Sequence, residues 1–167
     1  LCELIFSADR SYMAEGEFEE LDNKEASIVL SNSNFGRFLM SNDMSRLDTR
    51  FIGLPNQLLL TKQNQGKYIL AKEAHELGLV TFIFDDIDWD DEIRLFLEER
   101  SSFSPDSMVG MEANLRFPGK ETMETKIFGR LTAWQNWIFQ RPSAVGEEGA
   151  LKKYGTGNKG MYTKERT

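Results

Sequence analysis

Residues 1–13 read LCELIFSADRSYM and decide how the rest of the chain is interpreted. Apolar side chains recur at helical spacing, at Leu1, Leu4, Ile5 and Ala8, which predicts the buried face of an α-helix. Neither an initiator Met nor a capping residue precedes this helix. We therefore expect the helix to continue from residues before Leu1 and the chain to be the C-terminal part of a larger protein.

The composition excludes several classes of protein. Of the 167 residues, 40% are hydrophobic and 11% aromatic, which is enough for a packed core and too much for a disordered tail. The formal net charge is −7 and Lys and Arg do not cluster, so we expect no nucleic-acid partner. No apolar run approaches the roughly 20 residues that cross a bilayer, so we expect no membrane contact.

The scarcity of cysteine and histidine narrows the possible chemistry. Cys2 is the only cysteine and His75 the only histidine. An internal disulfide is therefore impossible, and a single thiol fits the reducing cytoplasm. Zinc sites with several His or Cys ligands and a Ser–His–Asp triad with any other imidazole are excluded. We expect Cys2 in the core, His75 at the surface, and carboxylates as the acid–base groups.

Hydrophobic patterning predicts strands mainly in the first half of the chain and amphipathic helices in the second. The first half is expected to contain Asp43 as a helix cap and Gly78 as a helix end, and Ser104-Pro105 is a start signal for a later helix. The predicted strands are residues 9–13, 26–30, 67–70 and 79–84, and the predicted helices are residues 44–52, 58–61, 71–77, 90–100, 105–116, 121–141 and 147–154.

The clearest periodicity lies in residues 121–141, where apolar residues repeat at spacings of three and four. Trp134 and Trp137 lie in this stripe, which is more typical of a core or a subunit interface than of a ligand platform. Near the end of the chain, Gly155, Gly157 and Gly160 spell G-x-G-x-x-G. A dinucleotide site needs a strand before this motif and a helix after it, so we interpret it as a tail.

Two groups of carboxylates are candidates for acid–base work. Glu3 lies between Cys2 and Leu4 in the predicted buried helix, and proximity to apolar surface suits a carboxyl group to proton transfer. The alternative is a solvent-facing Glu at a helix start. The second group is an acidic loop that contains Glu15, Glu17, Glu19, Glu20, Asp22 and Glu25. Most of these carboxylates must be solvated, and one of them could be a second catalytic acid.

Two segments resemble the crotonase (enoyl-CoA hydratase/isomerase) superfamily. CELIFSADRSYM, residues 2–13, resembles its helix–strand segment, in which a C/S-x-E-L helix leads into an A-D-x-x-Y strand. LAKEAHELGLVTFIF, residues 70–84, resembles its A-x-E-A-x-x-L-G-L-V segment. The resemblance implies an α/β fold, namely the C-terminal half of a crotonase spiral in residues 1–103, followed by an extended α-helical region in residues 104–167.

A narrower resemblance covers almost the whole chain. Several segments are similar to the ring-cleaving benzoyl-CoA-dihydrodiol lyases of this superfamily, namely Asn34-Phe35-Gly36, Ser45-Arg46-Leu47 with Arg50-Phe51, DDIDW at residues 85–89 and the long block at residues 110–142. This family implies the addition of water to 2,3-epoxybenzoyl-CoA and release of formate and 3,4-didehydroadipyl-CoA semialdehyde. The implied partner is an aromatic acyl-CoA substrate, and the implied reaction needs no metal and no redox cofactor. The protein is expected to be a homo-oligomer in the cytoplasm.

The resemblance also implies roles for individual residues. Two backbone N–H groups that stabilise the thioester oxygen are expected before Leu1, so the segment alone should be inactive. Glu3 falls on a catalytic glutamate position. The second acid is open: alignment by Gly36 gives the non-acidic Asn32, whereas alignment by Phe18 gives Asp22, with Glu19 and Glu25 nearby. The expected wall against the aromatic ring is formed by Asn34, Phe35, Phe38 and Met40.

Two other functions stay open at this point. The chain could belong to another crotonase-type hydratase or isomerase, or it could be a non-catalytic helical assembly module whose purpose is the surface of residues 121–141. The first alternative would keep the fold and change the reaction, whereas the second would tolerate Glu3→Gln.

Overall fold

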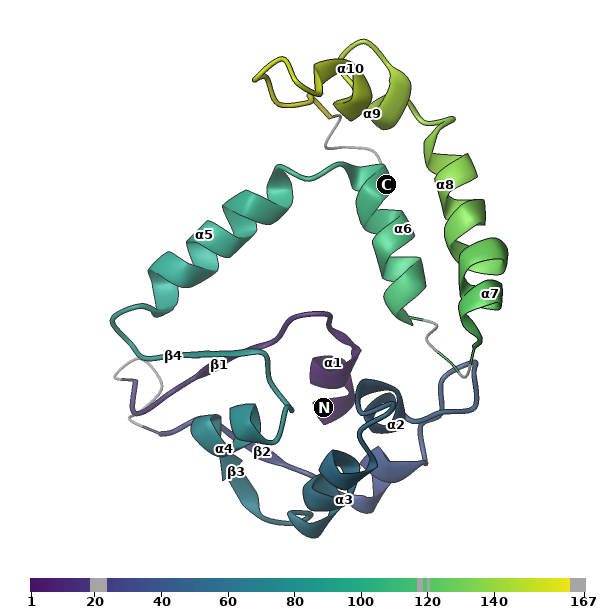
Figure 1. Cartoon of the computed structure of the whole chain (residues 1–167). Coiled ribbons are helices and arrows are strands. Elements are labelled where there is room, and N and C mark those ends of the chain that lie inside the picture. Colours follow the sequence, from purple (N-terminus) through teal and green to yellow (C-terminus); the bar gives the residue numbers. More distant parts are fainter. Residues whose placement is uncertain (19–23, 117–118, 120, 163–167) are drawn as a thin grey trace. The chain divides into compact units, whose positions relative to one another are not determined.

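The computed structural model describes residues 1–18, 24–116, 119 and 121–162, and the chain divides into two units, Leu1–Arg94 and Leu95–Thr167. The described part combines helices with two small sheets (Figure 1), which is compatible with the predicted α/β class. The predicted domains, residues 1–103 and 104–167, stay a prediction.

Short helices and four short strands make up the described part of the first unit. The expectation that strands dominate here is wrong, because every strand has three residues. The elements in chain order are α1 (Cys2–Ser7), β1 (Tyr12–Ala14), β2 (Ser27–Val29), the 3₁₀ helix η2 (Asn32–Phe35), α2 (Arg46–Arg50), α3 (Pro55–Gln63), β3 (Tyr68–Leu70), α4 (Ala71–Glu76) and β4 (Phe82–Phe84), with α5 (Trp89–Ser101) crossing the boundary between the units.

The strands pair two by two, each within its predicted segment or one residue beyond it. β1 runs parallel to β4, with Met13 opposite Ile83, and β2 runs antiparallel to β3, with Ile28 opposite Ile69. Successive side chains along β1 and β4 point to opposite faces of this sheet. Met13 and Ile83 contact the core, whereas the rings of Tyr12, Phe82 and Phe84 stack on one another.

One hydrophobic core holds the first unit together. It draws side chains from α1, both sheets, α2, α4 and the segment after α4, and Leu47, Ile69, Ala74 and Leu79 are fully excluded from solvent. The run after α4 that was predicted as a buried strand is buried at Leu79 and Val80, but its strand begins only at Phe82.

The end of α4 follows the prediction and also supports α2. Gly78 has a φ of +72°, the left-handed conformation that ends a helix and favours glycine. Its carbonyl accepts a hydrogen bond of 2.6 Å from Arg50 Nε, and burial lowers the pKa of this guanidinium from its ordinary value. Gly78, the residue after the C-cap Leu77, thus connects the end of α4 to α2.

The start of α2 differs from the prediction. Asp43 does not cap the helix but adopts a φ of +59° in the preceding turn. Ser45 is the N-cap, because its hydroxyl accepts a hydrogen bond from the Asp48 N–H while the Asp48 carboxylate accepts one from the Ser45 N–H. This reciprocal capping box outcompetes a lone Asp two residues earlier, and it makes Arg46 the first helical residue.

In the second unit every described element of regular secondary structure is a helix. Ser104 hydrogen-bonds the Ser107 N–H at the start of α6, as its place before Pro105 predicts. The elements are α6 (Pro105–Arg116), α7 (Met123–Thr125), the π-helical segment η3 (Lys126–Leu131), α8 (Thr132–Ile138), α9 (Pro142–Val145) and α10 (Ala150–Lys153).

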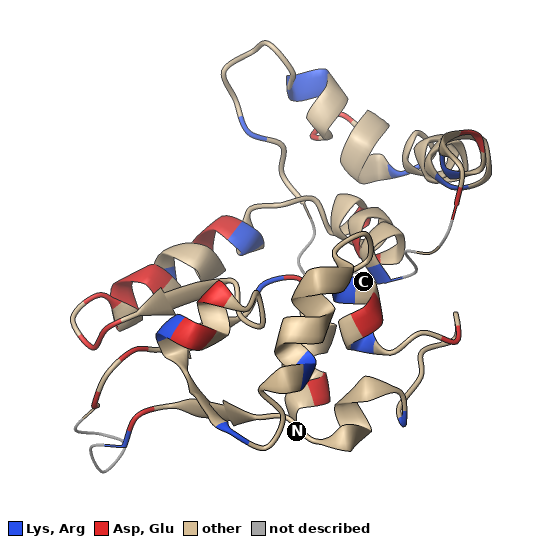
Figure 2. Cartoon of the chain, turned by 60° about the horizontal axis from the view of Figure 1, so that its bottom comes forward, with Lys and Arg blue, Asp and Glu red and all other residues tan. Residues whose placement is uncertain are grey.

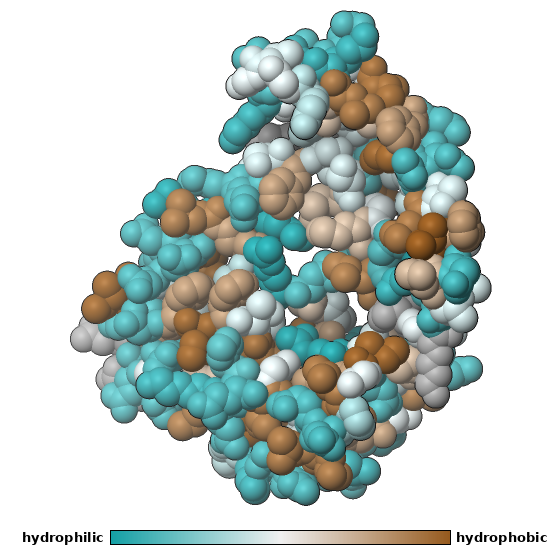
Figure 3. Space-filling view, viewed as in Figure 1, coloured by the Kyte–Doolittle hydropathy of each residue, from teal (hydrophilic) through white to brown (hydrophobic). Residues whose placement is uncertain are grey.

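The long helix predicted at residues 121–141 is interrupted by η3, and Pro142 begins α9 rather than ending the helix. A π segment closes i→i+5 bonds and so adds a residue to the turn, which rotates the residues on its two sides out of register. Trp134 is half-buried and lies near Gly110 of α6, whereas Met123 and Phe128 are 71% and 74% exposed. Apolar side chains therefore remain at the surface (Figure 3).

A buried polar cluster joins the start of α6 to the start of α9. Asp106 is 2% exposed, and its carboxylate accepts hydrogen bonds from Ser143 Oγ and, at 3.1 Å, from Arg141 Nε. Ser143 also accepts a hydrogen bond from Ser104 Oγ at 3.1 Å. A buried carboxylate needs such partners because burial of an unpaired charge is costly.

Charged side chains are distributed along the helices (Figure 2). Acidic residues occupy the first turn of α5 and Arg100 its last turn, as the helix dipole favours. His75 is exposed, as expected, and Cys2 is half-buried against the core. Among the described residues, no helix has the length and apolar character required to span a membrane. Gly155 and Gly157 follow the short helix α10 rather than a strand, as the interpretation of a tail requires.

The conformation of Gly78 predicts a measurable cost for Gly78→Ala. A Cβ there adopts a strained φ and approaches Phe51 Cε1 to 3.2 Å, so we expect the free energy of unfolding to fall by about 1–2 kcal/mol or more. Gly53→Ala is the matched control, because Gly53 has a φ of +82° with nothing within 4 Å. Urea unfolding should show the larger loss at Gly78, and equal stability of Gly78→Ala and the unchanged protein would contradict this conformation.

Candidate active site

Glu3 lies on α1, but the buried face of this helix is not the predicted one. Phe6 is buried and Cys2 and Ile5 pack against the core, whereas Leu1 and Leu4 are exposed. The prediction that Leu1 and Leu4 are buried is therefore wrong, because the face with Cys2 and Phe6, four residues apart, contacts the core. Cys2 Sγ also lies 3.5 Å from the Val29 carbonyl of β2. The Glu3 side chain is 18% exposed, so it is neither fully solvated nor sealed.

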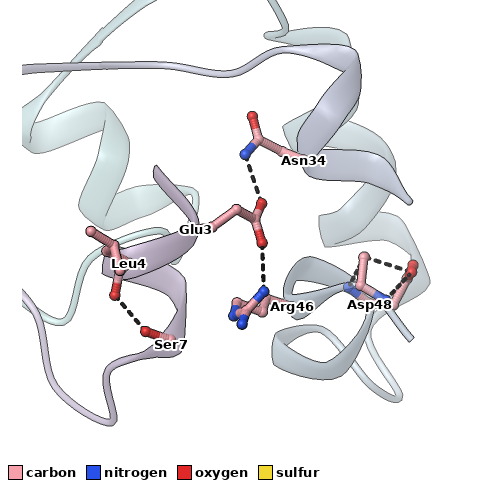
Figure 4. A network of polar contacts seen from close by, with 7 residues as sticks. Glu3, Leu4, Ser7, Asn34, Arg46 and Asp48 are labelled. Carbon is pink, nitrogen blue, oxygen red and sulfur yellow. Dashed lines mark hydrogen bonds and ion pairs between the residues drawn. The ribbon is translucent and has the colours of Figure 1, made fainter. Parts of the chain in front are cut away.

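Asn34 on η2 holds one oxygen of the Glu3 carboxylate. Its Nδ2 donates a hydrogen bond of 2.7 Å to Glu3 Oε1 (Figure 4). Its Oδ1 accepts hydrogen bonds from the Ser31 N–H at 2.9 Å and from Ser31 Oγ at 3.3 Å. The Ser31 donors determine which end of the amide faces Glu3. Asn34 is 6% exposed, so this orientation is held inside the protein.

Arg46 on α2 holds the other oxygen. Its guanidinium donates a hydrogen bond of 3.0 Å from Nη1 to Glu3 Oε2 (Figure 4). The side chains of this ion pair are 29% exposed for Arg46 and 18% for Glu3. The carboxylate therefore accepts one hydrogen bond at each oxygen, from two different segments. Each oxygen keeps a further lone pair, and partial exposure leaves room for a water molecule or substrate.

The residues predicted to form the ring wall are placed differently from one another. Phe35 packs against the core and lies under Lys62, whose Nζ is 6.0 Å from the ring centroid. Phe38 is 51% exposed, with the Arg37 guanidinium 5.9 Å from its ring. Met40 is half-buried, and its N–H donates to the Met44 carbonyl at 2.9 Å. Of the four predicted residues, Asn34 is the one whose hydrogen bond to Glu3 the structure shows, and the wall stays a prediction.

The second acid stays a prediction too. Asp22 lies outside the described residues. Glu25 is exposed and lies two residues before β2, and between the residues that the structure describes no hydrogen bond or ion pair links it to Glu3. Glu15, from the same acidic loop, pairs with Lys72 at 2.6 Å, and this contact raises the pKa of Lys72 from its ordinary value.

Sequence reasoning missed Arg46 as a member of this site. Arg46 follows Glu3 by 43 residues, and no periodicity relates residues that far apart. A local signal did exist, because Ser45 and Asp48 have the spacing of a capping box and thereby place Arg46 at the first helical position. The direction of its side chain toward Glu3, however, depends on how α1 and α2 pack.

Comparison with known proteins agrees with the resemblance seen in the sequence. Over 164 residues, which are 97% of this chain, the sequence is 52% identical to benzoyl-CoA-dihydrodiol lyase of Aromatoleum evansii. The chain spans 28% of the length of that relative. No protein-family model matches the chain. The predicted resemblance to these lyases is thereby confirmed.

The central position of Asn34 predicts a loss of stability in Asn34→Leu. Leucine keeps the branched outline of asparagine but leaves the Ser31 N–H and Glu3 Oε1 without their amide partner, and an unsatisfied buried polar group costs about 1–3 kcal/mol. Ser33→Ala is the control, because Ser33 takes part in this network only through its backbone N–H. Thermal unfolding should separate the two variants, and equal melting temperatures would argue against the Asn34 contacts.

Proposed function

We propose that the protein containing this chain is a ring-cleaving lyase of crotonase type that acts on 2,3-epoxybenzoyl-CoA. The similarity to benzoyl-CoA-dihydrodiol lyase over 97% of the chain carries this proposal. The Glu3 carboxylate, partly exposed and held by Arg46 and Asn34, supplies the acid–base group that such a reaction needs. The parallel pairing of β1 with β4 is compatible with part of a crotonase spiral, which we propose as the fold.

The proposed reaction converts the epoxide to formate and 3,4-didehydroadipyl-CoA semialdehyde. Two water molecules balance the atoms, and no electrons leave the substrate, because the epoxide and the water supply all the oxygen of the products. Because the conversion is redox-neutral, we propose that it needs no redox cofactor. We also propose that it uses no metal and that it takes place in the cytoplasm. Within this chain Glu3 exchanges a proton with water or with the ring, and the acidic loop with Asp22 and Glu25 supplies the second acid.

Phe35, Phe38 and Met40 are proposed to line the aromatic ring of the substrate. Phe38 is the member whose ring is most available, because it is 51% exposed. Ring stacking or edge contact with a planar acyl group favours aromatic side chains at such a wall. Asn34 supports the same loop from inside, through its contact with Glu3.

The test of this function measures formate. The protein expressed from its complete reading frame is incubated with enzymatically generated 2,3-epoxybenzoyl-CoA, and stoichiometric formate is the expected result. Glu3→Gln should abolish turnover with an unchanged circular dichroism spectrum, since glutamine keeps the shape of the side chain but cannot accept the proton. His75→Gln is the matched control, because His75 is exposed on α4 and has no proposed role.

Each outcome of this assay points to one function. Hydration of a simple enoyl-CoA without formate would move the function to a crotonase-type hydratase. Full turnover of Glu3→Gln would remove Glu3 from the mechanism. Asp22→Asn and Glu25→Gln then identify the second acid, which is the member of the pair whose loss stops formate release.

We also propose that the protein forms a homo-oligomer through the apolar side chains of α7 and η3. Met123 and Phe128 are 71% and 74% exposed, and Ile127 and Leu131 on η3 are 39% and 45% exposed. A contiguous exposed apolar patch is typical of an interaction surface. Phe128→Asp should lower the mass measured by light scattering, because a charge at an apolar contact must lose its hydration. Leu151→Asp, at an exposed residue of α10, is the control, and an unchanged mass for Phe128→Asp would contradict this surface.

A further inference from the structure

The backbone of Arg46 is held in place at the start of α2. Its backbone begins α2 between Ser45, which is 2% exposed, and Leu47, which is fully buried. The capping box of Ser45 and Asp48 holds the helix start, with the Ser45 hydroxyl donating to the Asp48 carboxylate at 2.6 Å. The guanidinium is thus presented to Glu3 by a backbone that has little freedom to move.

The Glu3 carboxylate is held from two sides at once. Arg46 Nη1 lies 3.0 Å from Oε2 and Asn34 Nδ2 lies 2.7 Å from Oε1. Because Arg46 and Asn34 are donors in these contacts, both oxygens of Glu3 act as acceptors. Two donors on different oxygens also determine the plane of the carboxylate. A carboxylate oriented in this way directs its remaining lone pairs at a fixed place, where a proton donor such as water can be met.

We propose that Arg46 is a positioning residue that, together with Asn34, orients the Glu3 carboxylate as the proton acceptor for the attacking water. This inference rests on the proposed function and decides between the two roles open to Glu3. The water oxygen forms a bond to a ring carbon of the epoxide, the C–O bond of that carbon breaks with its electron pair on the epoxide oxygen, and one water proton moves to Glu3. The proton then passes to the epoxide oxygen.

The competing explanation is an ion pair that only stabilises the fold. Glu3 and Arg46 join α1 to α2, and partly exposed pairs commonly contribute little more than about 1 kcal/mol to stability. A purely structural pair affects the melting temperature and leaves the turnover of the folded protein unchanged. A positioning residue instead lowers kcat with little change in KM, because it contacts the catalytic group and not the substrate.

The test is a double-mutant cycle in the protein expressed from its complete reading frame, with 2,3-epoxybenzoyl-CoA as substrate and isotopically labelled formate as readout in single turnovers. Arg46→Met should lower the rate by about 10²-fold, the loss typical of a misplaced catalytic group, while KM changes by less than about twofold. Arg46→Lys should recover part of this loss. In the Glu3→Gln background Arg46→Met should have no further effect, because Arg46 acts through Glu3.

Arg50→Met is the matched control for this cycle. It removes an arginine of the same helix whose hydrogen bond goes to the Gly78 carbonyl, so it should lower the melting temperature and leave the rate of the folded protein unchanged. A rate for Arg46→Met within about twofold of the unchanged protein would overturn the inference. Multiplying losses in the double variant would overturn it as well. Absence of formate from the unchanged protein would instead refute the proposed function.

Discussion

The carboxylate of Glu3 is the point on which the candidate site depends. It joins three segments that are distant in sequence, since Asn34 and Arg46 follow Glu3 by 31 and 43 residues. The core brings these segments together, with Phe6 of α1 and Leu47 of α2 among its members and Phe35 of η2 packed against it. The polar contact then selects one arrangement, because each donor left without Glu3 would be a partly buried group without its partner.

Local chemistry is what sequence reasoning predicted well. Gly78 ends α4, Ser104-Pro105 begins α6, and the strands around Met13, Ile28, Ile69 and Ile83 lie within or next to their predicted segments. Each of these features depends on neighbouring residues, namely a left-handed glycine, a cap before proline or a run of β-branched and aromatic residues. The resemblance to the lyases was also visible, since short motifs keep their residues in order.

What sequence reasoning missed depends on packing between segments. The face of α1 that is buried contains Cys2 and Phe6 rather than Leu1 and Leu4, and both faces are apolar enough to be chosen by pattern alone. The π segment η3 could not be predicted because helical periodicity is counted at a constant number of residues per turn. The role of Arg46 required both the true helix start at Ser45 and the packing of α1 against α2.

The two carboxylates at the centres of the polar networks differ in the property that matters for chemistry. Asp106 and Glu3 each meet an arginine and a neutral donor, so hydrogen-bond partners alone do not distinguish a structural group from a reactive one. Access does. Asp106 is 2% exposed and is enclosed by α6 and α9, whereas the Glu3 side chain keeps 18% of its surface. A proton acceptor must reach the proton that it takes, and of these two groups only Glu3 has a side chain that is open to solvent in part.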